Sequence, residues 1–389
     1  MPFNARCTGH GNRFQAAEEV NEMLSIVHAR TDFFQREIGQ PQPNTKTGPA
    51  PGFAGAIPID TQSFSQVALS GDVAFLGCDL EINRRYGRHN PGAASFLRKK
   101  TKAAGPYRGL YDLGSVTSTD PSEAMIEIAD TAATVVNSGG LPVIIGCDHT
   151  ASLAGLLGSA RDEPERPVYV YFDAHFDLGR NCAEDDRLHN GGFVGDMLRH
   201  KWARCAVNIG GRSIATQLDY PDTPRFASIP AYTSISLLTQ CLAPLKGETI
   251  YVSLDADVLD PAFAPNVACP EPGGLSVEAL SRCCRWLNRN CRVIGADLME
   301  ALPHQGNRLA EDALLKCLLT LTGKEPLHET RHRIRTEKST HSPARPETTS
   351  SRKTNVPYCR LVETNAATPC EEPSMKDRTQ TTRPATVVS

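Results

Sequence analysis

Acidic side chains and histidines gather in three short segments of the sequence, at spacings that suit metal binding. Asp173–Asp177 reads DAHFD, Asp255–Asp257 reads DAD, and Asp148 precedes His149. Residues two apart in an extended segment project to the same side, so the segments at 173–177 and 255–257 each present their polar side chains together. Carboxylates and imidazoles without thiolates are ligands for Mn, Mg, Fe or Zn, and the excess of carboxylates favours Mn.

Each of these segments follows an apolar run that predicts a buried strand. The runs are Leu141–Ile145, Val168–Phe172 and Thr249–Leu254. A single Asp-x-His is more often a capped loop end, but acids repel one another when several meet at buried strand ends. Multivalent cations relieve that repulsion. Carboxylates able to bridge favour two metals about 3.5–4 Å apart that activate a shared water.

The surrounding sequence predicts alternating strands and helices. Near-continuous apolar runs are typical of strands buried on both faces of a parallel sheet. Asp120, followed by Pro121 and Glu123, predicts a capped helix start. We therefore expect an open α/β fold with a mostly parallel sheet, whose ligands bind beyond the carboxyl ends of the strands. Further strands are predicted at Val73–Leu76, Ala206–Ile209 and Val293–Ala296, and further helices at Leu275–Asn288 and Arg308–Leu321.

Length and composition restrict the class of protein. The chain has 389 residues and a net charge of −3, which argues against a nucleic-acid partner. No apolar run approaches the roughly 20 residues of a membrane span, and the N-terminus has no secretory pattern. Thirteen cysteines without a C-x-x-C pair indicate reduced thiols and a cytoplasmic location.

Composition also divides the chain into three parts. Residues 1–70 are predicted to form an N-terminal extension that is partly helical, around residues 16–27. Residues 71–323 hold the strand and helix signals and form the predicted catalytic domain. Residues 324–389 are rich in Thr, Ser, Pro, Arg and Glu, and their low apolar content predicts a disordered tail.

Five motifs, in family order between Val73 and Leu321, resemble those of the ureohydrolase family, which includes arginases and agmatinases. The resemblance implies a three-layer αβα fold of the arginase and deacetylase type. The agmatinase-like branch matches best. The motifs are Gly146–Thr150 (family GGDHS), Asp173–Asp177 (DAHxD), Ser253–Pro261 (SxDxDxxDP), Glu271–Ser276 (PGGL) and Gly295–Pro303 (G-x-D-x-x-E-x-x-P).

The resemblance further implies two Mn2+ ions in each subunit. One ion would be held by His149, Asp173, Asp177 and Asp255, and the other by Asp173, His175, Asp255 and Asp257. Asp173 and Asp255 would bridge the two ions. Their water would attack the guanidinium carbon and release urea and an amine. Asp148, Asp297 and Glu300 would orient the ligands.

The resemblance also suggests residues that act on the substrate. His189 matches a family histidine that passes protons to the leaving amine, and we count Asp177 and Glu278 with it as catalytic. Many members place a guanidinium-binding acid where this chain has Ala279, so Glu278 is one residue early. That shift turns a helical side chain by about 100°. Cys147 also replaces a usual glycine.

The predicted function is a manganese hydrolase that cleaves a guanidino group to urea and an amine. The arginase-type loop is not recognisable in Leu178–Leu188, so agmatine or another guanidino-alkyl compound is the expected substrate. Arginase and formimidoylglutamase activities are alternatives on the same fold. A single-zinc deacetylase-like hydrolase and a pseudoenzyme that only binds are alternatives of other classes. The resemblance implies a homo-oligomer, a trimer or hexamer, with no membrane partner.

Overall fold

A computed structural model describes residues 52–89, 91–102, 107–179, 188–214, 225–303 and 309–324. The helix predicted around residues 16–27 and nearly all of the predicted tail lie outside these ranges. The division of the chain near residues 70 and 324 therefore stays a prediction. None of the helices in the described ranges combines the length and hydropathy that a membrane span needs.

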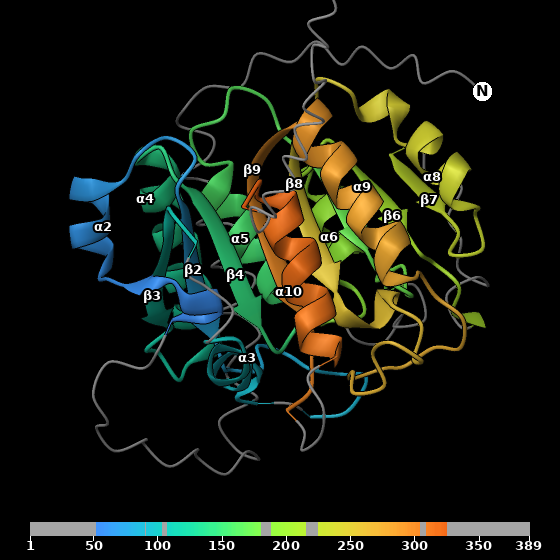
Figure 1. Ribbon diagram of the computed structural model, residues 1–389, viewed down its shortest axis with the longest axis horizontal. Helices are drawn as coiled ribbons and strands as arrows, with labels where there is room; N and C mark the ends of the chain where they lie inside the picture. The colour runs from blue at the N-terminus through green and yellow to red at the C-terminus, as the bar shows by residue number, and fades with distance from the viewer. Residues whose placement is uncertain are drawn as a thin grey trace, which may run out of the picture. The chain divides into compact units, whose positions relative to one another are not determined.

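The described residues form one nine-stranded sheet in the order β1-β3-β2-β4-β9-β8-β5-β6-β7 (Figure 1). Every neighbouring pair is parallel, which confirms the predicted parallel α/β sheet. The strands are β1 (Ile57–Pro58), β2 (Val73–Cys78), β3 (Leu110–Ser115), β4 (Leu141–Gly146), β5 (Val168–Phe172), β6 (Cys205–Ile209), β7 (Phe226–Ile229), β8 (Thr249–Asp255) and β9 (Arg292–Met299).

Six of these strands were predicted from their apolar runs, and they occupy the centre of the sheet. The three that were not predicted, β1, β3 and β7, lie at or beside its edges. Both residues of β1 are exposed, and β3 and β7 mix buried residues with partly or fully exposed ones, so these sequences lack the continuous apolar run of a central strand. Although Ile57–Pro58 falls within the predicted extension, it pairs with β3 and extends the sheet.

Helices cover both faces of the sheet, which gives the predicted three layers. α3, α8, α9 and α10 pack on one face, and α4, α5 and α6 pack on the other (Figure 1). α2 lies against α4. The helices are α2 (Thr61–Val67), α3 (Ala93–Thr101), α4 (Pro121–Asn137), α5 (Ala151–Ser159), α6 (Phe193–Arg199), α8 (Ile235–Cys241), α9 (Val277–Asn290) and α10 (Leu309–Leu321).

Local sequence signals explain where some helices begin. They also explain why α5, one of the helices that were not predicted, was missed. The Asp120 carboxylate accepts hydrogen bonds from the backbone N–H groups of Ser122 and Glu123, so the predicted start of α4 is confirmed. Ser276 caps α9 in the same way, at the backbone N–H of Ala279. Every residue of α5 is buried, so its sequence lacks the amphipathic pattern that reveals a surface helix.

Strand register brings the ends of four central strands to one level. Leu254 of β8 pairs with Phe172 of β5 and with Leu298 of β9. Leu298 also pairs with Ile145 of β4. Because all four strands run parallel, the residues that follow them meet at the same edge of the sheet.

Candidate metal centre

The six predicted metal ligands come from three of these strand ends. Asp255 is the last residue of β8, and Asp257 lies in the short 3-10 turn that follows. Asp173 directly follows β5. The other ligands, His149, His175 and Asp177, lie in the turns after β4 and β5.

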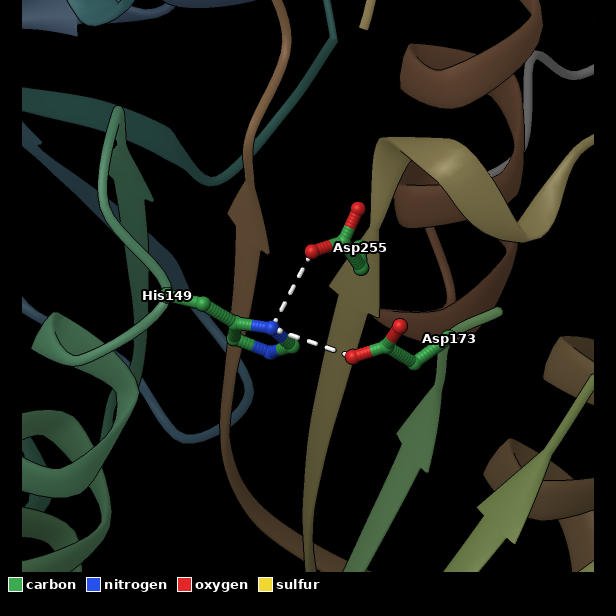
Figure 2. A group of neighbouring side chains, drawn as sticks. All are labelled: His149, Asp173 and Asp255. Carbon is green, nitrogen blue, oxygen red and sulfur yellow. Dashed lines mark ion pairs between the residues drawn. The ribbon is translucent and has the colours of Figure 1, made fainter. Parts of the chain in front are cut away.

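The first group of ligands surrounds the imidazole of His149 (Figure 2). Its Nδ1 lies 3.0 Å from Asp255 Oδ2 and 3.2 Å from Asp173 Oδ2. Asp177 Oδ2 lies 3.3 Å from the same nitrogen. Figure 2 shows the two aspartates approaching the ring from neighbouring strands, β8 and β5. An oxygen of each of three carboxylates thus lies within 3.3 Å of one ring nitrogen.

The second group surrounds His175 and shares Asp173 with the first. His175 Nδ1 lies 3.1 Å from Asp257 Oδ2 and 3.3 Å from Asp173 Oδ1. Asp173 therefore offers one oxygen to each histidine. His149, Asp173 and Asp255 can converge on one ion, and Asp173, His175 and Asp257 on another. We call these sets the first and second metal groups.

The charges in this cluster are unbalanced without cations. Burial raises the pKa of Asp177 to about 7, and the charge of Asp173 adds to the effect. Burial also raises the pKa of Asp255 well above its ordinary value, with help from Asp257 and Asp173. Burial acts to raise the pKa of Asp173 as well, but contacts with His149 and His175 outweigh it and lower that pKa. Protons thus compete for positions that cations would fill.

The residues fit a pair of divalent metals. His149 Nδ1 and Asp173 Oδ2 are buried, and neither has a hydrogen-bond partner among the described residues. Such orphaned polar atoms are unfavourable unless an ion or water satisfies them. The donors are carboxylate oxygens and imidazole nitrogens, which suits Mn2+ and similar ions.

A buried polar chain holds His149 from the far side of its ring. His149 Nε2 lies 2.8 Å from the hydroxyl of Ser253, and that hydroxyl donates to Asp297 Oδ1 at 2.6 Å. Tyr169 OH lies 3.5 Å from the same ring nitrogen. Asp297 is thus linked to the His149 ring through Ser253. Ser253 and Tyr169 were not predicted as functional, although Ser253 lies inside the SxDxDxxDP motif.

A second buried network supports the backbone at His149. Glu300 Oε1 accepts the backbone N–H of His149 at 3.0 Å, and its Oε2 pairs with Arg84 Nη2 at 2.7 Å. Asp148 accepts the backbone N–H groups of Thr150 and Asn83. Asp148 and Glu300 thus support the turn that carries His149.

Cys147, which stands where the family usually has a glycine, fits this network. Its backbone carbonyl accepts from the Arg84 guanidinium. Cys147 is buried and its φ is not positive, so the backbone there accommodates a side chain.

The loop from Ala174 to Asp177 is also held firmly. Asn208 Nδ2 donates to the carbonyl of His175 at 2.9 Å, and the Tyr171 hydroxyl donates to that of Phe176 at 2.7 Å. The Ala174 N–H donates to Asp257 Oδ1 at 3.1 Å. The bond from Ala174 joins the loop after β5 to the turn after β8, and the other two bonds hold the loop against β6 and β5.

His189 lies just before α6 and is buried. The Gly191 N–H donates to His189 Nδ1 at 3.1 Å, and the ring meets Tyr86 edge-on with centroids 5.8 Å apart. The carbonyl of Asp177 accepts the backbone N–H groups of Val194 and Gly195, which ties the start of α6 to the metal centre.

Glu278 is not brought into the cluster. Its side chain is 64% exposed on α9 and pairs with Arg282 at 2.7 Å. A different glutamate, Glu271, lies at the centre, with Oε1 3.5 Å from His175 Nε2. Glu271 belongs to the PGGL-like segment, but its residue type gave no sign of this contact.

Comparison with known sequences places the chain in a family. The sequence profile of the Arginase family matches residues 72–322, about two-thirds of the chain. The chain belongs to the arginase family. Relatives in this family are hydrolases of guanidino or amidino groups, and a solved neighbour from Trypanosoma cruzi holds Mn2+. The predicted enzyme class, a hydrolase of linear amidines, is therefore confirmed.

Individual relatives span several activities. Formimidoylglutamase of Chromobacterium violaceum is 26% identical over 248 residues, 59% of this chain and 80% of that protein. Mitochondrial agmatinase of Gallus gallus is 29% identical over 262 residues, 60% of this chain and 74% of that protein. A solved Trypanosoma cruzi formiminoglutamase variant with Mn2+ has a TM-score of 0.58 and 19% identity, covering 69% of this chain and 99% of that one. This likeness confirms the arginase-type fold.

Proposed function

We propose that the protein is a binuclear, manganese-dependent hydrolase that cleaves a guanidino group to urea and an amine. The observation that carries the proposal is the position of Asp173, whose two oxygens face His149 and His175. A carboxylate placed between two ligand groups suits a bridge between two ions. Manganese is favoured by the excess of carboxylate ligands and by the Mn2+ in the Trypanosoma cruzi structure.

The six predicted ligands would hold the ions, which supply Lewis acidity and a water of lowered pKa. In the reaction, water adds to the amidine carbon, the bond from that carbon to the amine nitrogen breaks, and the amine takes a proton. The chain's task is to hold the planar cation against the metal centre and to deliver that proton. Asp177 is proposed as a ligand of the first ion because its carboxylate lies beside His149 Nδ1.

His189 is the proposed proton donor. Its Nδ1 accepts the Gly191 N–H, so in the neutral ring the proton resides on Nε2. The edge-on contact with Tyr86 restricts rotation of the ring. In its imidazolium form a histidine can pass a proton to a leaving amine, which is the role proposed for His189.

Agmatine or another guanidino-alkyl compound is the proposed substrate class. The relative from Gallus gallus carries the name agmatinase. Formimidoylglutamate is the second candidate, because the Chromobacterium violaceum relative bears that activity in its name and is matched over 80% of its length. Both substrates present a planar cationic amidine carbon to the metals.

A product screen tests this proposal. Protein loaded with Mn2+ is incubated with agmatine, arginine, 4-guanidinobutyrate and formimidoylglutamate, and urea and formamide are measured. We expect product from at least one compound and none after the metal is removed with a chelator. Asp130→Asn is a matched control, since Asp130 is exposed on α4 and pairs with Arg161. If the loaded protein turns over none of the four, the proposed function is wrong.

The assembly and cellular location stay predictions. The homo-oligomer was implied by family resemblance, and the cytoplasmic location by cysteine composition. Light scattering on the purified full chain measures the oligomeric state, and a fluorescent fusion in its native cell reports the location.

A further inference from the structure

Glu271 lies at the metal centre but belongs to neither metal group. Its Oε1 is 3.5 Å from Nε2 of His175, and the side chain is 25% exposed. The other ring nitrogen of His175, Nδ1, faces Asp173 and Asp257. The His175 ring therefore lies between the Glu271 carboxylate and the other two members of the second metal group, Asp173 and Asp257.

The backbone of Glu271 is fixed relative to that group by Arg212. The guanidinium donates to the carbonyl of Asp257 at 2.7 Å and to that of Glu271 at 3.0 Å. It also donates to the carbonyl of Pro272 at 3.2 Å. A single side chain thus joins the turn that carries a metal ligand to the segment that carries Glu271.

The segment can follow this path because of a glycine. Gly274 has φ of +140°, and a Cβ there would lie 2.5 Å from the backbone nitrogen of Asp260. The next residue, Leu275, donates its backbone N–H to the carbonyl of Val258 at 2.9 Å. The segment is therefore packed against the turn after β8 and holds Glu271 in place.

The other glutamate near this segment faces elsewhere. Glu278 accepts from Arg282 on the exposed surface of α9, and Ala279 beside it is buried in the core. Of these two acids, Glu271 is the one in contact with a metal-group histidine.

Charge balance gives Glu271 a role that the ligands cannot fill. Asp173, Asp177, Asp255 and Asp257 carry four negative charges when ionised, and two divalent cations would cancel them. The charges of the ligand carboxylates would then be balanced by the ions. A further carboxylate outside the ligand set adds attraction for a cationic amidine, and its two oxygens match the planar N–H groups of an amidinium.

We propose that Glu271 binds the cationic amidine group of the substrate at the metal centre and is the principal determinant of that recognition. This inference rests on the proposed function, since it assumes that an amidine is the group attacked. A glutamate that only orients His175 would instead act through metal affinity, as outer partners of ligating histidines do. The two roles give different results when the charge is removed without a change of shape.

The experiment compares Glu271→Gln, Glu271→Asp and the control Asp130→Asn in the full chain loaded with Mn2+. Calorimetry measures Mn2+ binding and, separately, the binding of methylguanidinium. Kinetics on the best substrate from the screen give kcat and KM. Glu271→Gln should keep both Mn2+ sites, bind methylguanidinium about 10- to 100-fold more weakly and lower kcat/KM to match. Glu271→Asp should recover part of the loss, and Asp130→Asn should behave as wild type.

Two results overturn the inference. One is that Glu271→Gln binds methylguanidinium as wild type does while its Mn2+ affinity falls, which would make Glu271 a positioning residue for His175. The other is that the loaded wild-type protein binds no methylguanidinium. If wild type binds this cation through Glu271 but turns over no compound in the screen, the proposed function fails while the assignment of Glu271 stands.

Discussion

The strand ends that carry the metal groups and the segment that carries Glu271 surround the same centre but are held by different means. Asp173 and Asp255 extend from β5 and β8, whose register is set by continuous pairing. Glu271 depends instead on Arg212 and on the positive φ of Gly274. In this molecule the sheet fixes the proposed metal ligands, while the proposed substrate contact depends on the path of a loop.

This contrast predicts that the largest loss of activity comes from the shared strand-end ligand. Asp173→Asn removes the proposed bridge, so kcat/KM should fall at least about 10³-fold, since metal assistance supplies several kcal/mol. The assay is product release with saturating Mn2+, with Asp130→Asn as the control. A loss of less than about tenfold would contradict the shared role of Asp173.

Supports beneath the strand ends should matter for stability. Arg84→Met leaves the buried Glu300 carboxylate unpaired, which should lower the free energy of unfolding by about 3–5 kcal/mol. Arg282→Met on exposed α9 removes a surface pair and should change it by roughly 0.5 kcal/mol or less. Chemical denaturation measures both. Equal effects would show that the Arg84 network does not hold the turn at His149.

A smaller effect on metal binding is expected from a residue that contacts a proposed metal ligand but not the ions themselves. Ser253→Ala removes the partner of His149 Nε2, so Mn2+ should bind the first metal group about 10- to 100-fold more weakly. Calorimetric titration measures the change, and Ser65→Ala, at an exposed position on α2, is the control. Unchanged Mn2+ affinity would show that Ser253 is not needed to orient the ring.

The mildest test varies pH. The pKa of Asp177 is raised to about 7 in the metal-free fold, against about 4 in the unfolded chain. A raised carboxyl pKa stabilises the fold below the unfolded value, and that contribution is lost as pH rises through 7. Bound Mn2+ takes the place of the proton on Asp177, so the folded protein no longer loses this stability as the pH rises. The gain in Tm on adding Mn2+ should therefore be larger at pH 8 than at pH 5. In Asp177→Asn this difference between the two pH values should be smaller. A gain independent of pH would contradict this linkage.

Sequence patterns predicted the central strands and the meeting of the three polar segments because buried parallel strands leave continuous apolar runs. They did not reveal the edge strands β1, which is exposed, and β7, which is mostly half-buried, because neither carries such a run. The contacts of Arg84 and Glu271 were also missed. Each joins segments far apart in the chain, and a lone charged residue in a loop gives no periodic signal.

The sequence showed that Glu278 lies one residue before Ala279, where many family members have the guanidinium-binding acid. It did not show which way either side chain faces. Ala279 turns into the core of the helix layer, and Glu278 turns out to meet Arg282. Glu278 was predicted to be catalytic because of its position along the chain, whereas the direction of its side chain depends on how α9 docks.

The central claim is that two metal ions share Asp173. The most direct measurement is the number of Mn2+ ions bound per chain, by calorimetric titration of the metal-free protein with metal analysis of the product. Two tight ions per wild-type chain, with both sites weakened in Asp173→Asn, are predicted. A single tight ion in the wild type, or an Asp173→Asn variant that still binds two tightly, would contradict the shared centre.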